Sequence, residues 1–294
     1  MLYQSGPHGR DPLNQGGFFI MIINHNIAAL NTHRQLGSAT NAQAKSMEKL
    51  SSGQRINRAG DDAAGLAISE KMRGQIRGLD QASRNAQDGI SLIQTAEGAL
   101  NETHDILQRM RELAVQSGND TSTDDDRAEL QREVAQLIEE VERIGNNTQF
   151  NTQDILKADQ TLDINIGSNS GQSLTIEWKA QLSTALGEDA VDISAVDIST
   201  KDGAQAALDT MDSAIASVSK SRSQMGAYEN RLEHSINNLN TSSENLTAAE
   251  SRIRDVDMAK EMMEQTKNSI LSQASQAMLA QANQTPQNVL QLLR

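Results

Sequence analysis

Histidine, cysteine and serine are the residue types that could carry catalysis or bind a metal. Neither the number nor the spacing of these residues in the chain supports such a site. The five histidines lie far apart, at His8, His25, His33, His104 and His234. None has a glutamate one residue on and a second histidine four residues on, so the zinc-protease signature HExxH is missing. The chain has no cysteine, which excludes thiolate metal sites and disulfides. No Ser, His and Asp set falls in a nucleophile motif, so we predict neither an enzyme nor a cofactor.

A glycine-rich stretch at residues 51–65 is the next candidate, because such loops can cradle phosphate. Gly53, Gly60 and Gly65 punctuate it, and Asp61 with Asp62 precedes a helical pattern. It lacks the GxxxxGK[ST] spacing and follows no strand, which does not fit a phosphate loop. Because aspartates cap helix N-termini well, we expect a connector that leads into a helix. The acidic run 124–126 lies in a turn and indicates helix caps or solvated charge.

The composition narrows the class of protein. The chain has 294 residues, 37% hydrophobic and only 2% aromatic, which suits long helices packed along seams better than a thick core. A net charge of −13 argues against a nucleic-acid surface. The apolar run 16–23 is too short to span a membrane, and it lacks the cleavage site of a secretory signal. We therefore expect no nucleic acid and no membrane as partners, and a route out of the cell, if any, without a cleaved signal.

A helix over 66–116 is the element around which the chain is organised. It contains no proline, and apolar or small residues recur at every seventh position: Leu79, Ala86, Ile93, Leu100, Leu107 and Ala114. So narrow a stripe needs partner helices. One is predicted over 127–144, antiparallel after a short turn. Another is predicted over 201–253, where a second seven-residue line runs through Met211, Val218, Met225, Leu232, Leu239, Leu246 and Ile253.

Between these helices the apolar period changes from helical spacing to two. Leu162, Ile164 and Ile166 alternate with polar residues, and Leu174, Ile176 and Trp178 do so again after a glycine-flanked turn at 167–171. This pattern predicts a β-hairpin whose apolar face docks on the helices. Residues 179–200 contain two copies of Val-Asp-Ile-Ser and are expected to form a short surface excursion.

The two ends of the chain are amphipathic but almost uncharged. No residue between Met21 and His33, or between Asn268 and Leu293, carries a full charge. Uncharged polar side chains suit a face that meets other protein, so we expect self-assembly through both termini; frayed tails that never order remain the alternative. The residues expected to mediate assembly are Ile23, Ile27, Leu30, Met278, Leu279, Val289, Leu290 and Leu293.

The fold class predicted from these patterns is mainly α: a long antiparallel coiled-coil helical rod with one β-hairpin, plus paired terminal helices. Residues 1–20 are expected to be either a disordered leader, not native to the protein, that precedes a start at Met21, or an ordinary flexible tail. The expected division is a leader at 1–20, a terminal helical domain of 21–52 with 258–294, a rod and hairpin domain of 53–178 with 201–257, and the excursion at 179–200.

Several stretches of the chain resemble bacterial flagellin. The similar motifs are Met21–Ile27, Leu50–Asn57, Asp61–Ser69, Leu107–Gln116, Asn147–Asn151, Ala249–Ala259 and Val289–Arg294. They cover essentially residues 21–178 and 200–294. The resemblance implies a short flagellin in which about twenty residues stand in place of large outer domains.

The resemblance also implies a function and a set of partners. It implies a subunit that polymerises with itself into the extracellular flagellar filament for motility, with the terminal segments lining the inner tube. It implies export by the flagellar type III apparatus, an export chaperone at the C-terminal segment, and contacts with filament cap and hook-associated proteins. A hook–filament junction protein of the same superfamily and a non-polymerising secreted helical binding protein remain the alternatives.

One binding site follows from the resemblance residue by residue. In flagellins that the vertebrate innate immune receptor for flagellin recognises, the contact patch lies on the Arg-Glu-Leu-Ala-Val-Gln helix and its antiparallel neighbour. The matching residues here are Arg109, Leu113, Gln116 and Glu133. From periodicity alone, Leu113 also fits a core position and the charged residues fit a solvated face.

Overall fold

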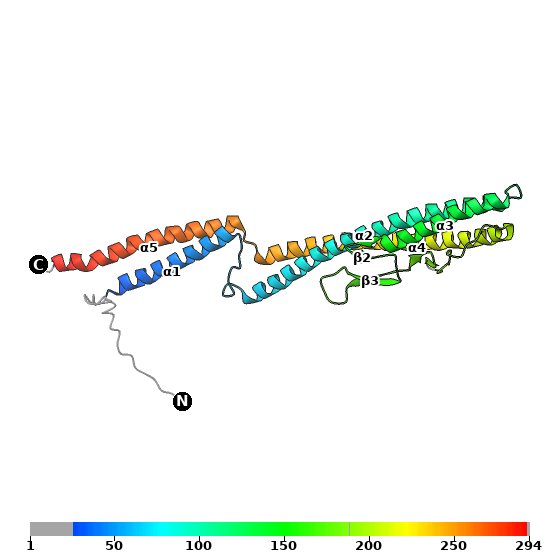
Figure 1. The fold of residues 1–294 in the computed structure, drawn as a ribbon. Coiled ribbons are helices and arrows are strands. Elements are labelled where there is room, and N and C mark those ends of the chain that lie inside the picture. The colour runs from blue at the N-terminus through cyan, green and yellow to red at the C-terminus, as the bar shows by residue number, and fades with distance from the viewer. Residues whose placement is uncertain (1–25, 188, 293–294) are drawn as a thin grey trace, which may run out of the picture. The chain divides into compact units, whose positions relative to one another are not determined.

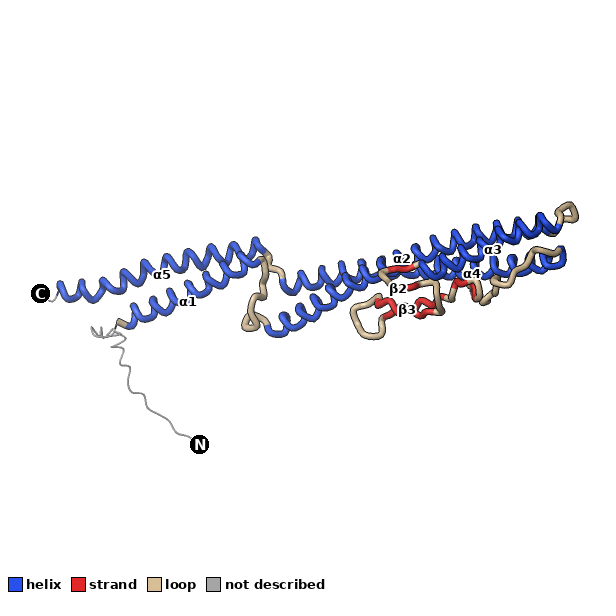
Figure 2. Tube along the Cα trace, viewed as in Figure 1, coloured by secondary structure: helices blue, strands red, loops and turns tan. Residues whose placement is uncertain are grey.

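A computed structural model describes residues 26–187 and 189–292, with backbone only for 286–292. The expected leader at 1–20 lies outside the described residues. The described residues divide into two compact units: the first takes residues 26–63 and 254–292, the second residues 64–187 and 189–253. The helices and the few short strands are shown in Figures 1 and 2. This mainly helical architecture confirms the predicted fold class.

The first unit is built on an antiparallel pair of helices, α1 (Ile27–Ser52) and α5 (Met258–Leu292), which run side by side in Figure 1. At one end Asn26 caps α1: its side-chain oxygen accepts from the N–H of Ala29, and its amide nitrogen donates to the carbonyl of Ala282 at 2.7 Å. At the other end Gln54 and Asp255 form an antiparallel bridge. These contacts join segments more than 200 residues apart in the sequence.

The connector after α1 is ordered by local polar contacts. Gly53 ends α1 in the left-handed conformation, at a φ of 69° that glycine adopts without strain. The carboxylate of Asp61 accepts from the N–H groups of Arg58 at 3.0 Å and Asn57 at 3.2 Å, which holds its pKa below the ordinary range. Arg58 in turn pairs with Glu48 of α1. The Asp61 carboxylate of the glycine-rich stretch therefore binds backbone of its own loop.

The second unit is a bundle of α2 (Ala63–Ser117), α3 (Asp124–Asn147) and α4 (Lys201–Arg254). Polar contacts show that α2 and α4 run antiparallel: Arg111 pairs with Asp212, and Gln94 donates to Glu229. The predicted seven-residue lines form the core, and all their members from Leu79 to Ala114 and from Met211 to Leu239 are buried. The helix α4 begins at the predicted residue 201, and the other observed helix ends lie one to three residues beyond the predicted ones.

The hairpin pairs β3 (Gln160–Asn165) with β4 (Ser173–Trp178) in the register that the alternation requires, Leu162 opposite Ile176 and Ile164 opposite Leu174. Its apolar face joins the helical core. Gly89 of α2 permits this docking, because a Cβ there would lie 2.3 Å from the Ile164 side chain. Two smaller strand pairs were not predicted: β1 (Gln149–Phe150) with β2 (Gln153–Asp154), and β5 (Gln181–Leu182) with β6 (Ala185–Leu186).

Residues 179–200 are not the surface excursion that was expected. We call 181–198 the clamp segment, because Leu186, Ile193 and Ile198 are completely buried in the core that α2, α3 and α4 form. It passes so close to the helices that a Cβ on Gly145 of α3 would lie 2.4 Å from the carbonyl oxygen of Gln181. Burial of three large aliphatic side chains makes the clamp segment part of the bundle.

The repeated Val-Asp-Ile-Ser sequence has a structural explanation within the clamp segment. In each copy the aspartate accepts from the N–H of the serine two residues on, Asp192 from Ser194 at 2.9 Å and Asp197 from Ser199 at 2.8 Å. The isoleucine between them is buried both times. The repeat therefore builds two similar turns that each insert one side chain into the core.

Glu142 of α3 binds the clamp segment, and we expect this contact to make the stability of the fold depend on pH. Its carboxylate accepts from the N–H and hydroxyl of Ser183, and these donors hold the pKa of Glu142 below its ordinary value of 4.5. A lowered folded-state pKa gives stability that is present above the unfolded pKa and lost as the pH falls through the folded value.

We expect Glu142→Gln to lower the free energy of unfolding by about 1 kcal/mol at neutral pH, because a neutral amide oxygen accepts from Ser183 more weakly than a carboxylate does. The difference from the natural chain should shrink below pH ~4. Urea unfolding of both chains between pH 7 and pH 3 measures it. An equal difference at every pH would contradict the assignment.

Candidate interaction surfaces

The helix pair α1–α5 exposes an unusual amount of large apolar surface. Among the residues expected to mediate assembly, Ile27 is 65% exposed, Leu30 68% and Met278 60%, while Leu279 is half-buried. Ile23 and Leu293 lie outside the described residues, and Val289 and Leu290 lie where only the backbone is described. Further large side chains are exposed on the same two helices: Met47, Met258, Met262, Met263, Ile270 and Leu271. A surface of this kind is typical of one that other protein covers.

A second candidate surface lies where α2 and α3 run side by side. Arg109 of α2 donates to Glu133 of α3 at 2.9 Å and to Glu112 one turn along α2 at 3.1 Å. These carboxylates, Glu133 above all, raise the pKa of Arg109, so its charge is fixed. Gln116 is exposed two turns further on. The arrangement offers a partner one fixed guanidinium, carboxylate oxygens and an amide.

Leu113 was expected to contact the receptor directly, but the structure places its side chain in the core. It is 1% exposed and belongs to the core of the bundle, so its side chain cannot touch a partner of the folded chain. The cause is its place on the same helical face as Met110 and Leu107, which face inward. Leu113 can affect the surface only by holding α2 in place beneath Arg109 and Gln116.

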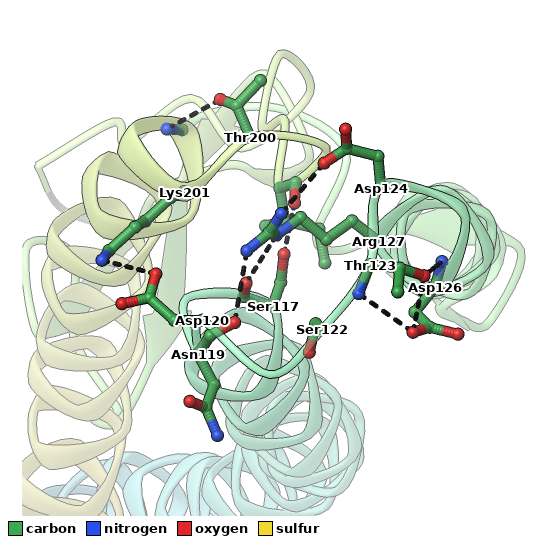
Figure 3. A network of polar contacts seen from close by, with 12 residues as sticks. Ser117, Asn119, Asp120, Ser122, Thr123, Asp124, Asp126, Arg127, Thr200 and Lys201 are labelled. Carbon is green, nitrogen blue, oxygen red and sulfur yellow. Dashed lines mark hydrogen bonds and ion pairs between the residues drawn. The ribbon is translucent and has the colours of Figure 1, made fainter.

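Arg127 organises the turn beside this surface, and sequence reasoning did not single it out. Figure 3 shows its guanidinium between the end of α2 and the start of α3, where it donates to the carbonyls of Ser117 at 2.9 Å and Asn119 at 3.2 Å. It also pairs with Asp124 at 3.0 Å, and its side chain is only 11% exposed. Arg127 therefore places a positive charge at the C-terminus of α2, where the helix dipole favours it.

The start of α3 and the start of α4 complete this network. Thr123 and Asp126 form a reciprocal capping box, which holds the pKa of Asp126 below its ordinary range. Lys201, at the start of α4, pairs with Asp120 in the turn at 2.7 Å. The acidic run 124–126 thus has the capping role that was expected as one of two interpretations. The signal that could have revealed Arg127 is its spacing three residues after Asp124.

Within the residues that the structure describes, no group of three or more His, Asp or Glu side chains is placed to hold a metal ion. The Nε2 atom of His104, on α2, lies 2.7 Å from the side-chain amide nitrogen of Gln108. None of the described helices combines the length and apolar character needed to cross a membrane.

Comparison with known proteins agrees with this geometry. Residues 23–161 match the bacterial flagellin N-terminal helical region, and residues 208–293 match the bacterial flagellin C-terminal helical region. A flagellin of Halalkalibacterium halodurans is 63% identical over 281 residues, which cover 93% of this chain and 100% of the relative. The flagellin of Bacillus subtilis is 56% identical over 305 residues, with coverage of 93% and 100%.

A solved structure shares the fold at low sequence identity. It is described as a flagellar hook-associated protein from Vibrio parahaemolyticus, and it matches with a TM-score of 0.55. The match covers 66% of this chain and 100% of that protein at 13% identity, which is a likeness of fold alone.

Proposed function

Since this chain belongs to the bacterial flagellin family and is a structural subunit of the flagellar filament, we propose that its terminal helices α1 and α5 make the contacts between subunits. Flagellins form the filament outside the cell, and its relatives are structural proteins. The observation that carries the proposal is the exposed apolar surface of α1 and α5, which includes Ile27, Leu30 and Met278.

The proposal includes the route and the partners of assembly. The chain leaves the cell through the flagellar type III apparatus, and an export chaperone holds its C-terminal segment until then. Covering the exposed side chains of α5 during that time would prevent premature association. In the filament, the terminal helices line the inner tube, and cap and hook-associated proteins contact the subunits at the filament ends.

Point substitutions on α1 test the contact surface. We expect Ile27→Ser with Leu30→Ser to slow growth from filament seeds at least tenfold, because each subunit loses two apolar contacts of about 1–2 kcal/mol each. Gln35→Ser, an exposed polar change on the same helix, is the matched control. Electron microscopy and light scattering of seeded samples measure growth. Equal growth of the double variant and the control would rule out the contact role of α1.

We also propose that the monomer is recognised by the vertebrate innate immune receptor for flagellin through Arg109, Gln116 and Glu133. Support comes from the exposure of all three functional groups on adjoining faces of α2 and α3. Leu113 takes part only from beneath, as a core residue that fixes the course of α2.

Arg109 and Arg111 provide a matched pair of variants for this recognition. Both are about half exposed on α2 and both make an ion pair, Arg109 with Glu133 on the proposed surface and Arg111 with Asp212 of α4. We expect Arg109→Ala to weaken receptor activation by monomers about tenfold, the effect of losing one well-placed contact of about 1.4 kcal/mol. Arg111→Ala should leave potency unchanged in the same reporter-cell assay. If both variants lose potency equally, the proposed surface is wrong.

A further inference from the structure

The helix pair α1–α5 has more of its large apolar side chains on the outside than in the contact between the two helices. The positions of α1 that face α5 recur at alternating steps of three and four residues: Ala29, Thr32, Leu36, Ala39, Gln43, Ser46 and Leu50. The facing positions of α5 follow the same rule: Glu261, Gln265, Asn268, Ser272, Ser275, Leu279 and Ala282. We call these two lines the seam. Only three of its members are leucine, and its fully buried members are Ala39, Ser46 and Asn268.

The register of the seam can be read from one contact at each end. Asn26 donates to the carbonyl of Ala282, and Gln54 forms a bridge with Asp255. Counting inward from either contact places Asn268 opposite the stretch between Ala39 and Gln43, and Leu279 opposite Ala29. No leucine of α1 therefore lies beside the amide of Asn268, which is 7% exposed.

A seam that follows a seven-residue repeat can slip by seven residues and keep the same face. In one such slip Leu279 would move from Ala29 to Leu36, which pairs two leucines and favours the slip. The same movement would carry the amide of Asn268 from beside Ala39 and Gln43 to beside Ser46 and Leu50. The slip is therefore opposed by the cost of burying the amide against the larger apolar side chain of Leu50.

A slip would also damage the outer face of the pair. Seven residues of helix correspond to about 10 Å, so Ile27 and Leu30 of α1 would no longer lie level with the same apolar residues of α5. A neighbouring subunit that fits the native arrangement would meet a displaced one. The choice of register thus decides whether the surface for assembly exists.

We infer that Asn268 is a specificity-determining residue of filament assembly, because its buried amide holds α5 in the one register against α1 that aligns the outer apolar faces. In coiled coils in general, a single polar residue in an otherwise apolar seam specifies the register of the helices at a cost in stability. The inference rests on the proposed role of α1 and α5 in subunit contacts.

Cysteine pairs can read the register directly, because the chain has no cysteine of its own. Gln43→Cys with Gln265→Cys places two thiols opposite each other in the native register. Gln43→Cys with Ser272→Cys places them opposite each other after the slip. The two pairs share Gln43, and all three positions are partly buried seam positions, so the two reporters are matched. Oxidation and electrophoresis separate links within one chain from links between chains.

Asn268→Leu is the variant that removes the polar residue, and Asn268→Ser is the control that keeps a polar group. In the natural background we expect the native reporter to link in seeded filaments. With Asn268→Leu, we expect the ratio of native to slipped links to fall about tenfold and filament yield to fall with it. Asn268→Ser should keep both near the natural values.

Every outcome decides the inference. It is overturned if Asn268→Leu keeps the native links and grows filaments normally, or if Asn268→Ser fails as completely as Asn268→Leu. Loss of filaments with leucine but not with serine supports it, and the links of the unpolymerised chains then show the slip. The proposed contact surface is tested separately by Ile27→Ser with Leu30→Ser. Normal growth of that variant, with altered links in Asn268→Leu, would reject the surface but keep the register.

Discussion

A chain that lacks residues 258–294 is expected to form no filaments while its α2–α3–α4 bundle stays folded. The deletion removes α5 and leaves α1 without its partner helix. It removes no member of the hydrophobic core, all of whose residues lie between Leu79 and Leu246. The deletion should therefore abolish assembly and leave the folding of the bundle unchanged, because the two depend on different units of the chain.

Seeded growth and thermal unfolding measure the two halves of this expectation. Electron microscopy should show no extension of filament seeds, whereas the full-length chain extends them. Circular dichroism should show a cooperative unfolding transition for the remaining bundle, at a temperature close to that of the full-length chain. Filaments from the shortened chain would contradict the role of α5, and loss of the transition would contradict the independence of the bundle.

The second large effect is expected in the clamp segment. Ile193→Ala and Ile198→Ala should each lower the free energy of unfolding by about 2–5 kcal/mol, the range for isoleucines that are fully buried in a core. For a domain of this size each kcal/mol corresponds to about 2–4 °C in melting temperature. A surface excursion would give changes within about 0.5 kcal/mol, so the measurement separates the two descriptions of residues 179–200.

Val196→Ala is the control for the clamp segment. Val196 lies between the two isoleucines but is only partly buried, so its truncation should cost clearly less. Chemical denaturation of the three variants at one pH gives the comparison. Three small and equal effects would mean that the clamp segment does not pack in solution as the structure shows.

The helices and the hairpin could be predicted because their apolar residues are periodic. Seven-residue spacing from Leu79 to Ala114 and from Met211 to Leu239 marks faces that are buried in the structure. Alternation of Leu174, Ile176 and Trp178 marks the hairpin face in the same way. Each pattern is local, so it can be read without knowing what covers the face.

The clamp segment could not be predicted because its burial comes from residues far away in the sequence. Leu186, Ile193 and Ile198 follow neither helical nor strand spacing. What makes room for the segment is the missing side chain of Gly145 on α3, and of Gly187 against Ser217 on α4. The repeated Val-Asp-Ile-Ser gave a visible signal, but it does not reveal which of its residues point inward.

The candidate surfaces also combine features that the sequence predicts with features that depend on residues far away in the chain. Exposure of Ile27, Leu30 and Met278 agrees with the amphipathic, uncharged pattern of the two ends, which the sequence shows. The depth of Leu113 depends on how closely neighbouring elements pack around α2. The part played by Arg127 depends on a turn that brings it back to carbonyls eight and ten residues earlier.

The nested pairing of the helices implies an order of folding. The turn of Arg127 joins residues ten apart, Arg111 meets Asp212 across 101 residues, Gln94 meets Glu229 across 135, and Asn26 meets Ala282 across 256. Closing a loop costs more entropy the longer it is, but each inner contact shortens the loop that the next one must close. Contacts should therefore form first at the α2–α3 turn and then progressively toward the two ends of the chain. The helices proposed to join subunits would then be the last to pair, after the α2–α3–α4 bundle is complete.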